Sequence, residues 1–210
     1  MHVPSAFEEK RIDVMHQLMR EHSLATLVVQ TKDGLDANHI PLHIKQTETE
    51  FGTLVGHVAR NNPVWKMFKQ DVEVLAIFHG PNAYISPSWY PTKQENHKVA
   101  PTWNYATVHA SGFMRVIEDE NWLLELLDML TREHETHFKQ PWHVSDAPED
   151  FVKKLVSAIV GIEIPISKLI GKWKVSQNQP QRNQIGVIEG LAETSDLSGM
   201  ANFMHSHLNK

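Results

Sequence analysis

Three β-rich runs follow one another early in the chain: LATLVVQT (Leu24–Thr31), ANHIPLHI (Ala37–Ile44) and FGTLVGHV (Phe51–Val58). Lys32-Asp33-Gly34 joins the first two runs, and a polar stretch at 46–50 joins the second to the third. Valine, isoleucine and threonine favour strands, and short polar connections join antiparallel neighbours. The sequence therefore predicts an antiparallel meander as the start of the fold.

More strands are expected further along the chain. They are VEVLAIFHG and AYIS on either side of Gly80-Pro81, WNYATVHASGFMRVIED (103–119) and GIEIPISKLIGKWKV (161–175). Between them, three prolines in the stretch 86–101 oppose a long regular element and predict a loop.

Helices are expected where apolar residues recur at helical spacing. The predicted helices are Phe7–Met19 with Ser5 as N-cap, a short one from Asn62 or Pro63, Glu120–Phe138, Pro148–Ile159 with Asp146 as a cap candidate, and most of the tail Gln181–Leu208, in which three glycines leave the helix ends open. There is no regular βαβ alternation, so the fold class is α+β or mainly β, an antiparallel barrel with peripheral helices. We expect a single domain over residues 1–210 with a C-terminal helical extension.

Composition limits the function classes. With 41% hydrophobic and 21% charged residues the chain is typical of a globular protein. It has no apolar run of the ~20 residues that cross a bilayer and no signal-like N-terminus. We therefore expect a cytoplasmic protein that does not associate with a membrane. Without cysteine there is no disulfide or thiolate chemistry. The net charge of −5 does not support direct nucleic-acid binding.

The segment GHVARNNPVWK (56–66) surrounds a predicted helix start with His57, Arg60, Asn61, Asn62 and Lys66. Backbone N–H groups at a helix start, a guanidinium and a nearby ammonium suit a phosphate group. The same residues also suit an ordinary helix cap at Asn61 or Asn62 beside a solvated arginine. Both interpretations remain open from the spacing alone.

Two other segments combine aromatic and polar side chains. YISPSWYPTK (84–93) and VAPTWNYATVHASG (99–112) bring aromatic planes beside hydroxyl and amide groups, which suits a planar ligand such as a flavin or simple aromatic packing beneath a loop. KWKVSQNQPQRNQIGVIEGL (172–191) concentrates polar side chains before a helix, where they could cover a ligand or form an exposed turn: Lys174, Ser176, Gln177, Asn178 and Arg182.

Together, GHVARNNPVWK, SPSWYPTK, PTWNYATVHASG and KVSQNQP…GVIEGL resemble the PaiB-like FMN-binding proteins over most of the chain. The resemblance implies a split β-barrel homodimer, related in fold to pyridoxamine-phosphate oxidases and flavin reductases, with FMN at the subunit interface. It also implies the family's label of negative transcriptional regulator.

The resemblance further implies which residues hold FMN. The segment 56–66 would supply phosphate contacts, with Arg60, Asn61 and Asn62 first and His57 and Lys66 close by, although the Ser-Arg-Lys motif of the oxidases is absent. The remaining implied contacts come from the two other segments and are Trp103, Asn104 and Tyr105 near the ring or ribityl chain, Ser176, Gln177 and Asn178 at the edge of the site, and Ser86 and Lys93.

Other chemistries have less support. His134 and His137 in REHETHF miss the HExxH zinc pattern, because Phe138 stands where the second histidine belongs, so no metal site is expected. No nucleophile elbow is present. Three functions stay open: an FMN-binding regulator that acts indirectly or with a partner, a flavin-dependent oxidoreductase for a small molecule, and a haem-binding split-barrel relative. No catalytic residue is identified.

Overall fold

The computed structural model describes residues 1–194 and 198–208. Its chain forms two compact units. Unit 1 contains residues 1–18, 79–108 and 170–210, and unit 2 contains residues 19–78 and 109–169. The single domain expected over residues 1–210 stays a prediction, and the expected helical character of residues 195–197 lies outside the described residues.

Eight strands form one antiparallel sheet. They are β1 (Glu8–Glu9), β2 (Leu24–Thr31), β3 (Gly34–Lys45), β4 (Thr53–Ala59), β5 (Val74–Ile85), β6 (Thr102–Gly112), β7 (Arg115–Ile117) and β8 (Ile159–Lys174). Their order is β1-β8-β4-β3-β2-β5-β6, with β7 beside β8 and an additional pairing of β6 with β8. The expected antiparallel α+β class is confirmed.

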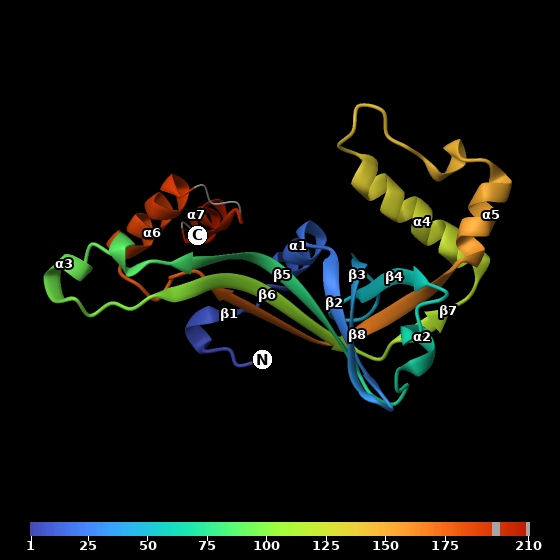
Figure 1. The fold of residues 1–210 in the computed structure, drawn as a ribbon, viewed down its shortest axis with the longest axis horizontal. Coiled ribbons are helices and arrows are strands. Elements are labelled where there is room, and N and C mark those ends of the chain that lie inside the picture. The colour runs from blue at the N-terminus through green and yellow to red at the C-terminus, as the bar shows by residue number, and fades with distance from the viewer. Residues whose placement is uncertain (195–197, 209–210) are drawn as a thin grey trace. The chain divides into compact units, whose positions relative to one another are not determined.

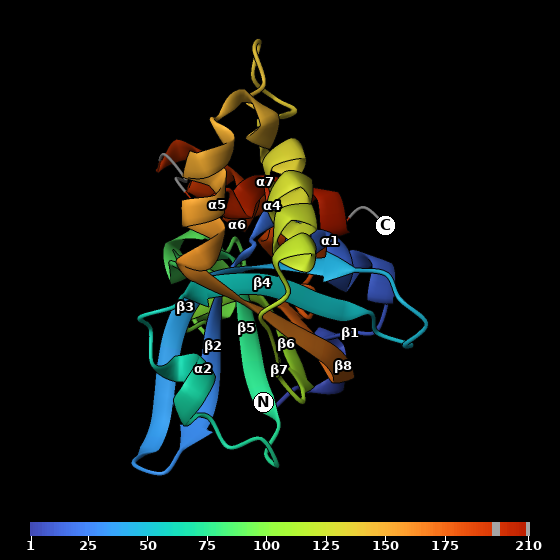
Figure 2. The same ribbon diagram turned by 90° about the vertical axis from the view of Figure 1, so that its right-hand side faces the viewer.

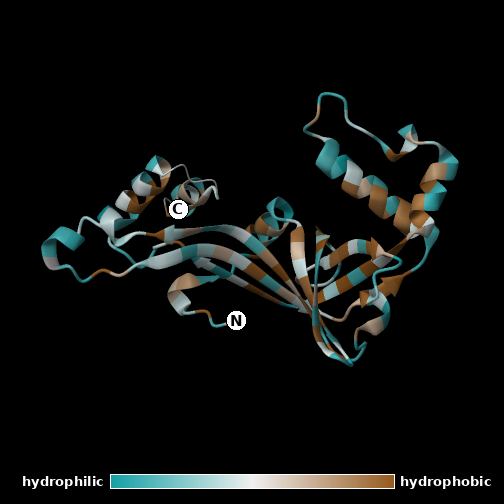
Figure 3. Cartoon of the chain, in the orientation of Figure 1, coloured by the Kyte–Doolittle hydropathy of each residue, from teal (hydrophilic) through white to brown (hydrophobic). Residues whose placement is uncertain are grey.

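The early meander is confirmed in unit 2. β2 and β3 pair along their length from Leu24↔Pro41 to Thr31↔Gly34, and β3 continues into pairing with β4. Side chains of β2 alternate between buried and more exposed positions, with Leu27 and Val29 in the core. Bands of apolar and polar residues accordingly alternate along the strands (Figure 3).

β5 differs from the expected pair of strands, because it runs unbroken through Gly80 and Pro81. Its pairing with β2 covers only Leu75–Ile77. Pro81 lies past that stretch, where a residue without an N–H group can be accommodated in a strand. Proline was therefore a poor guide to the strand boundary.

The long strand expected over 103–119 is instead two strands, β6 and β7, which are separated by Phe113 and Met114. At the end of β6, a Cβ atom on Gly112 would collide with the carbonyl oxygen of Pro165. This close approach in unit 2 explains the glycine. The strand-rich stretch after residue 160 is confirmed as the single 16-residue β8.

The N-terminal helix begins later than expected. Ser5–Phe7 is a 3₁₀ turn (η1), Glu8 and Glu9 pair with Lys172 and Gly171 of β8, and α1 spans Ile12–Glu21. Ser5 is therefore not the cap of this helix. Amphipathic spacing alone could not reveal that residues 8–9 join the edge of the sheet.

In unit 2, short α2 (Val64–Met67) follows β4, and α4 (Glu120–Glu135) and α5 (Glu149–Ser157) lie side by side (Figure 2). α4 is capped by Asp119, whose carboxylate accepts from the Trp122 N–H at 2.8 Å. Asp146 does not cap α5. It lies in the 3₁₀ turn η3 (Val144–Asp146) and accepts from the His143 N–H.

In unit 1, the loop expected at 86–101 contains only the 3₁₀ turn η2 (Pro87–Trp89) and short α3 (Lys93–Asn96). The tail forms α6 (Gln181–Glu193) and α7 (Met200–Leu208), which pack on each other (Figure 1). Beneath them lies a buried apolar cluster: Ile85, Tyr90, Val175, Val187, Leu191, Met200 and Met204. No helix in the described ranges is both long and apolar enough to span a bilayer.

Candidate functional site

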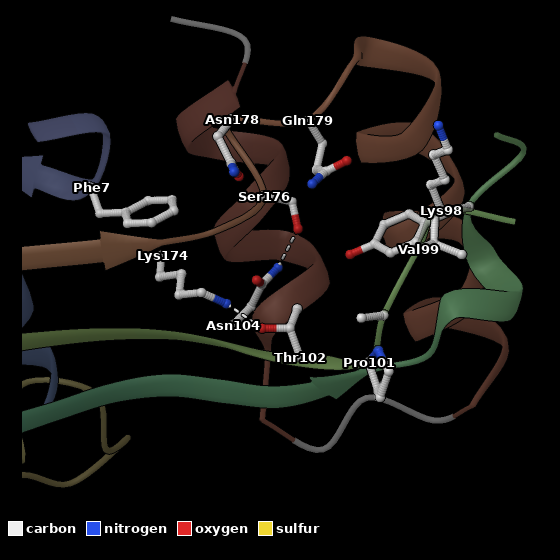
Figure 4. A pocket seen from close by; sticks show the side chains of 12 residues that line it. Phe7, Lys98, Val99, Pro101, Thr102, Asn104, Lys174, Ser176, Asn178 and Gln179 are labelled. Carbon is white, nitrogen blue, oxygen red and sulfur yellow. Dashed lines mark hydrogen bonds between the residues drawn. The ribbon is translucent and has the colours of Figure 1, made fainter. Parts of the chain in front are cut away.

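Unit 1 contains a pocket of about 300 Å³, within the range of small-molecule sites (Figure 4). It lies where the beginning of β6, the end of β8 and the loop before β6 meet. Its lining residues are Phe7, Tyr90, Lys98, Val99, Ala100, Pro101, Thr102, Asn104, Lys174, Ser176, Asn178 and Gln179. Apolar and aromatic side chains therefore line the pocket together with amides, hydroxyls and ammonium groups, and Phe7 lies on the opposite side from Val99 and Pro101 (Figure 4).

Asn104 is the most deeply buried polar residue of the pocket, with only 1% of its surface exposed. Its Nδ2 group donates to Ser176 Oγ at 2.9 Å and approaches Met204 Sδ at 3.4 Å. Its Oδ1 atom is buried and has no hydrogen-bond partner among the described residues. A buried acceptor without a partner is costly, so this atom points to a ligand or water that donates to it.

Ser176 adopts a left-handed backbone conformation with φ of 64°, which is strained for a residue with a side chain. This turn ends β8 and aims the hydroxyl at Asn104. The same hydroxyl hydrogen-bonds to Tyr90, but burial outweighs that bond and raises the pKa of the tyrosine hydroxyl. The strained turn thus ties β8 to two pocket residues.

Lys174 supplies positive charge. Its Nζ atom donates to Thr102 Oγ1 at 2.6 Å and to the carbonyl of Trp103 at 2.5 Å. Burial lowers the pKa of this ammonium, and the charge of Lys172, two positions away on the same strand, lowers it further. No acidic side chain of the described residues pairs with either lysine. An electron-rich ligand group would therefore stabilise the charged form of Lys174.

Of the residues that sequence reasoning placed in this part of the site, Asn104, Ser176 and Asn178 line the pocket. Gln177 lies beside it but folds back on its own turn, where its side chain accepts from the Val175 N–H and donates to the Trp173 carbonyl. These interactions shape the turn that presents Ser176 and Asn178.

The other predicted residues of unit 1 do not line the pocket. Trp103 is 56% exposed and meets Tyr84 edge-on, with 6.0 Å between ring centroids. Tyr105 lies under the Lys172 ammonium, 5.0 Å from it. Ser86 caps η2 by accepting from the Ser88 N–H, and Lys93 donates to the Ser88 hydroxyl.

The residues predicted to contact phosphate lie in unit 2. Arg60 uses its guanidinium within that unit, because it donates to the carbonyls of Ser157 and Ile159 and to the Glu118 carboxylate at 2.6 Å. Trp65 donates from its indole to the Arg60 carbonyl and is flanked by the Arg60 and Lys66 cations.

Asn62 acts as a local cap, because its Oδ1 accepts from the Val64 N–H while its Nδ2 donates to Asn38. Asn61 is exposed. The imidazole of His57 on β4 is half-buried, and burial lowers its pKa. The phosphate-binding and helix-capping interpretations of this segment can therefore both hold, and the assignment of phosphate contacts stays a prediction.

The pocket also contains residues absent from the FMN contacts that the resemblance implied, notably Phe7, Thr102 and Lys174, although the sequence had already placed Lys174 in a polar segment that could cover a ligand. Lys174 had a usable signal, because alternation along a strand places Lys172 and Lys174 on one face. Phe7 had none, since its position follows from the unexpected turn that precedes β1.

Comparison with known proteins bears on this pocket. Residues 1–168 match the family described as "Putative FMN-binding domain". Across its whole length the chain is 31% identical to protease synthase and sporulation protein PAI 2 of Bacillus subtilis, covering 99% of that protein. The chain belongs to this family. It is also 34% identical to an uncharacterized protein of Emericella nidulans, over 91% of this chain and 90% of that one.

Solved structures share the fold of this family member. The FAD and heme binding protein from Mycobacterium smegmatis matches with a TM-score of 0.59 at 13% identity, covering 80% of this chain and 73% of that one. The flavocytochrome Anf3 from Azotobacter vinelandii matches with a TM-score of 0.57 at 12% identity, covering 82% and 72%. The expected split β-barrel and the PaiB-like resemblance are confirmed. The family match ends at residue 168, before three of the pocket residues: Lys174, Ser176 and Asn178.

Proposed function

We propose that the protein binds FMN and that the unit 1 pocket receives part of the isoalloxazine ring. The observation that carries this proposal is the buried, unpartnered Oδ1 of Asn104 beside the Lys174 ammonium, in a pocket that apolar side chains also line. A flat apolar ligand with polar edges satisfies all three features. Membership of the family supports FMN in particular.

Within such a complex, Phe7, Val99 and Pro101 would contact the ring, and Asn104 and Lys174 would hydrogen-bond to its polar edge. Bound FMN would supply reversible electron transfer, while the pocket would orient the ring and limit its contact with water. Separately, the family resemblance assigns phosphate contacts to the segment 56–66 of unit 2, and we retain Arg60, Asn61 and Asn62 as the proposed side chains.

Titration of the apo-protein with FMN, followed by flavin fluorescence, tests the proposal. We expect saturable binding that weakens at least roughly tenfold in Lys174→Met, because a charge-assisted hydrogen bond contributes about 1.5–3 kcal/mol. Lys168→Met is the matched control, since Lys168 is exposed on the same strand. The absence of saturable binding by the unaltered protein would overturn the cofactor proposal.

We further propose a homodimer, as the family resemblance implies. Its support in this chain is the exposed aromatic pair Tyr84 and Trp103, 49% and 56% exposed on neighbouring strands. Large exposed aromatic side chains are typical of protein interfaces. Light scattering should show a dimer that Trp103→Ser weakens, whereas a monomer at all concentrations would contradict the proposal.

A regulatory role that depends on a protein partner is supported by the charge distribution. Residues 118–157, which include α4 and α5, contain ten acidic and four basic side chains. This segment therefore carries a net charge of −6, and the rest of the chain carries +1. A surface of this sign repels a phosphate backbone, so regulation would act through a protein. Salt-dependent binding to promoter DNA would contradict this version.

A flavin-dependent oxidoreductase is the second candidate, favoured by the uncompensated charge of Lys174. A cation close to a bound flavin stabilises its reduced, anionic form. Anaerobic mixing of the FMN-loaded protein with NADH or NADPH, followed by flavin absorbance, separates the candidates. Rapid bleaching would favour the enzyme, and a flavin that no nicotinamide reduces would favour the regulator.

A further inference from the structure

The orientation of the Asn104 amide determines what the pocket can recognise. Nδ2 faces the Ser176 hydroxyl and the thioether of Met204. A thioether sulfur accepts hydrogen bonds but cannot donate, so the amide nitrogen must be the atom on that side. Oδ1 is thus left as a pure acceptor, buried and without a partner among residues 1–194 and 198–208.

Lys174 presents the opposite polarity. An ammonium has three N–H groups, and Thr102 and the Trp103 carbonyl accept two of them. The third is free for a ligand, and the side chain lines the same hollow as Asn104 (Figure 4). The pocket therefore offers one acceptor and one charged donor to its occupant.

This pair selects between ligand groups. A phosphate or ionised carboxylate would suit Lys174 but would set its oxygens against the Asn104 oxygen, leaving that acceptor unpaired. A purely donating group would leave the third Lys174 N–H without an acceptor. A group with a donor next to an acceptor satisfies both, and in a planar flavin ring this is the N–H group flanked by carbonyl oxygens, the pattern of a cyclic imide.

We propose that the pocket recognises a cyclic imide edge, with Asn104 Oδ1 accepting from the imide N–H and Lys174 donating to an adjoining carbonyl. The inference rests on the proposed FMN function, because in FMN this edge is N3–H between the C2 and C4 carbonyls. The pyrimidine end of the ring would then enter the pocket, and the Ser176 turn would fix the Asn104 amide in the orientation that reads it.

The lowered pKa of Lys174 agrees with this geometry, because burial and the Lys172 charge both disfavour the ammonium until an electron-rich group approaches. A carbonyl oxygen provides that group without bringing a full negative charge to Asn104. Lys174 would then contribute to affinity, whereas Asn104 would determine the selectivity for an unsubstituted imide.

The test compares FMN with FMN methylated at N3, a change that removes the donor and leaves both carbonyls and the phosphate. Fluorescence titration of the unaltered full-length protein should show at least tenfold weaker binding of the methylated flavin, because the methyl group leaves the buried Asn104 acceptor unpaired. The comparison needs no variant, so it does not depend on a substitution being tolerated.

Two variants then assign the effect to residues. Asn104→Leu keeps the side-chain shape and removes both polar atoms, so it should bind the two flavins with nearly equal affinity. Lys174→Met should weaken both flavins and retain the preference for FMN. Lumichrome, which carries the imide edge without a ribityl chain or phosphate, should bind and compete with FMN.

The outcomes separate the two proposals. If FMN does not bind at all, the proposed function fails. If FMN binds but the N3-methyl analogue binds equally well to the unaltered protein, the FMN proposal stands and the imide assignment is overturned. The imide assignment is also overturned if Asn104→Leu folds and keeps the full preference for FMN.

Discussion

The side-chain amide of Asn104 on β6 donates to the Ser176 hydroxyl 2.9 Å away, although 72 positions separate the two residues. Both are buried, and Ser176 takes part from a left-handed turn at the end of β8. The hydroxyl also bonds to Tyr90. One strained serine therefore fixes the orientation of the pocket amide and anchors the loop residue opposite it.

Substitutions of Ser176 should separate the stabilisation that its hydroxyl contributes from the destabilisation caused by its left-handed backbone. Ser176→Ala keeps the left-handed strain and leaves Asn104 and Tyr90 without a buried partner, so we expect a loss of about 1–3 kcal/mol in the free energy of unfolding. Ser176→Gly also loses the hydroxyl but relieves strain of roughly 1 kcal/mol. Urea unfolding should rank glycine above alanine, and the reverse order would contradict the strain at this position.

Two glycines of α6 should behave unlike ordinary helical glycines. In an exposed helix, Gly→Ala stabilises by about 0.5–1 kcal/mol. Here a methyl group at Gly190 would collide with the Trp89 indole ring, and one at Gly186 with the Trp89 carbonyl. We expect either alanine to destabilise unit 1 by about 1–3 kcal/mol in thermal or urea unfolding.

The control comes from the group that each added methyl would strike, which is the Trp89 ring for Gly190 and the Trp89 carbonyl for Gly186. In a Trp89→Leu background, Gly190→Ala should become nearly neutral because the ring has gone. Gly186→Ala should remain destabilising, since its obstacle is backbone. Equal rescue of both variants would mean that α6 simply moves away from η2.

Those glycines also show why part of the fold escaped prediction. The composition of 181–208 predicted helix correctly, but Gly186 and Gly190 obscured the helix ends because their reason lies 97 and 101 positions away, at Trp89. Alternating apolar residues were sufficient to identify the meander, since that information is local. The start of α1 was not, because Glu8 and Glu9 are drawn into pairing with β8.

The residues of the candidate site were likewise only partly predictable from the sequence. Amide and hydroxyl groups after β8 marked Ser176 and Asn178 as candidates, and both line the pocket. Thr102 gave no comparable signal, because its role is to orient Lys174 across two strands. Neither the orphaned Oδ1 of Asn104 nor the three donations by Arg60 could be read from spacing, since each depends on partners distant in sequence.

Comparison of FMN with riboflavin tests the segment 56–66, because the two ligands differ only in the phosphate. If Lys66 and Asn61 contact phosphate, Lys66→Gln and Asn61→Ala should weaken FMN by roughly tenfold and leave riboflavin unchanged. Titration with both ligands measures the ratio. Arg60→Lys is less informative, because losing the forked donation to Ser157, Ile159 and Glu118 should also lower stability.

Acid should destabilise the protein partly through His57. Burial lowers the pKa of this imidazole in the folded chain, below its ordinary value of 6.5. As the pH falls below about 6.5, the unfolded chain therefore takes up the proton first, and the free energy of unfolding decreases until folded His57 is protonated too. Burial also lowers the pKa of His22 and His43, so several histidines contribute to the decrease in the free energy of unfolding with falling pH.

A difference measurement isolates the share of His57. His57→Gln keeps a polar side chain that does not titrate, so its free energy of unfolding should fall less steeply between pH 7.5 and pH 5, by at most about 1.4 kcal/mol per pH unit for one proton. Parallel curves for the unaltered protein and His57→Gln would show that His57 becomes protonated equally easily in the folded and unfolded chains, and the buried Nδ1 would then have found a partner.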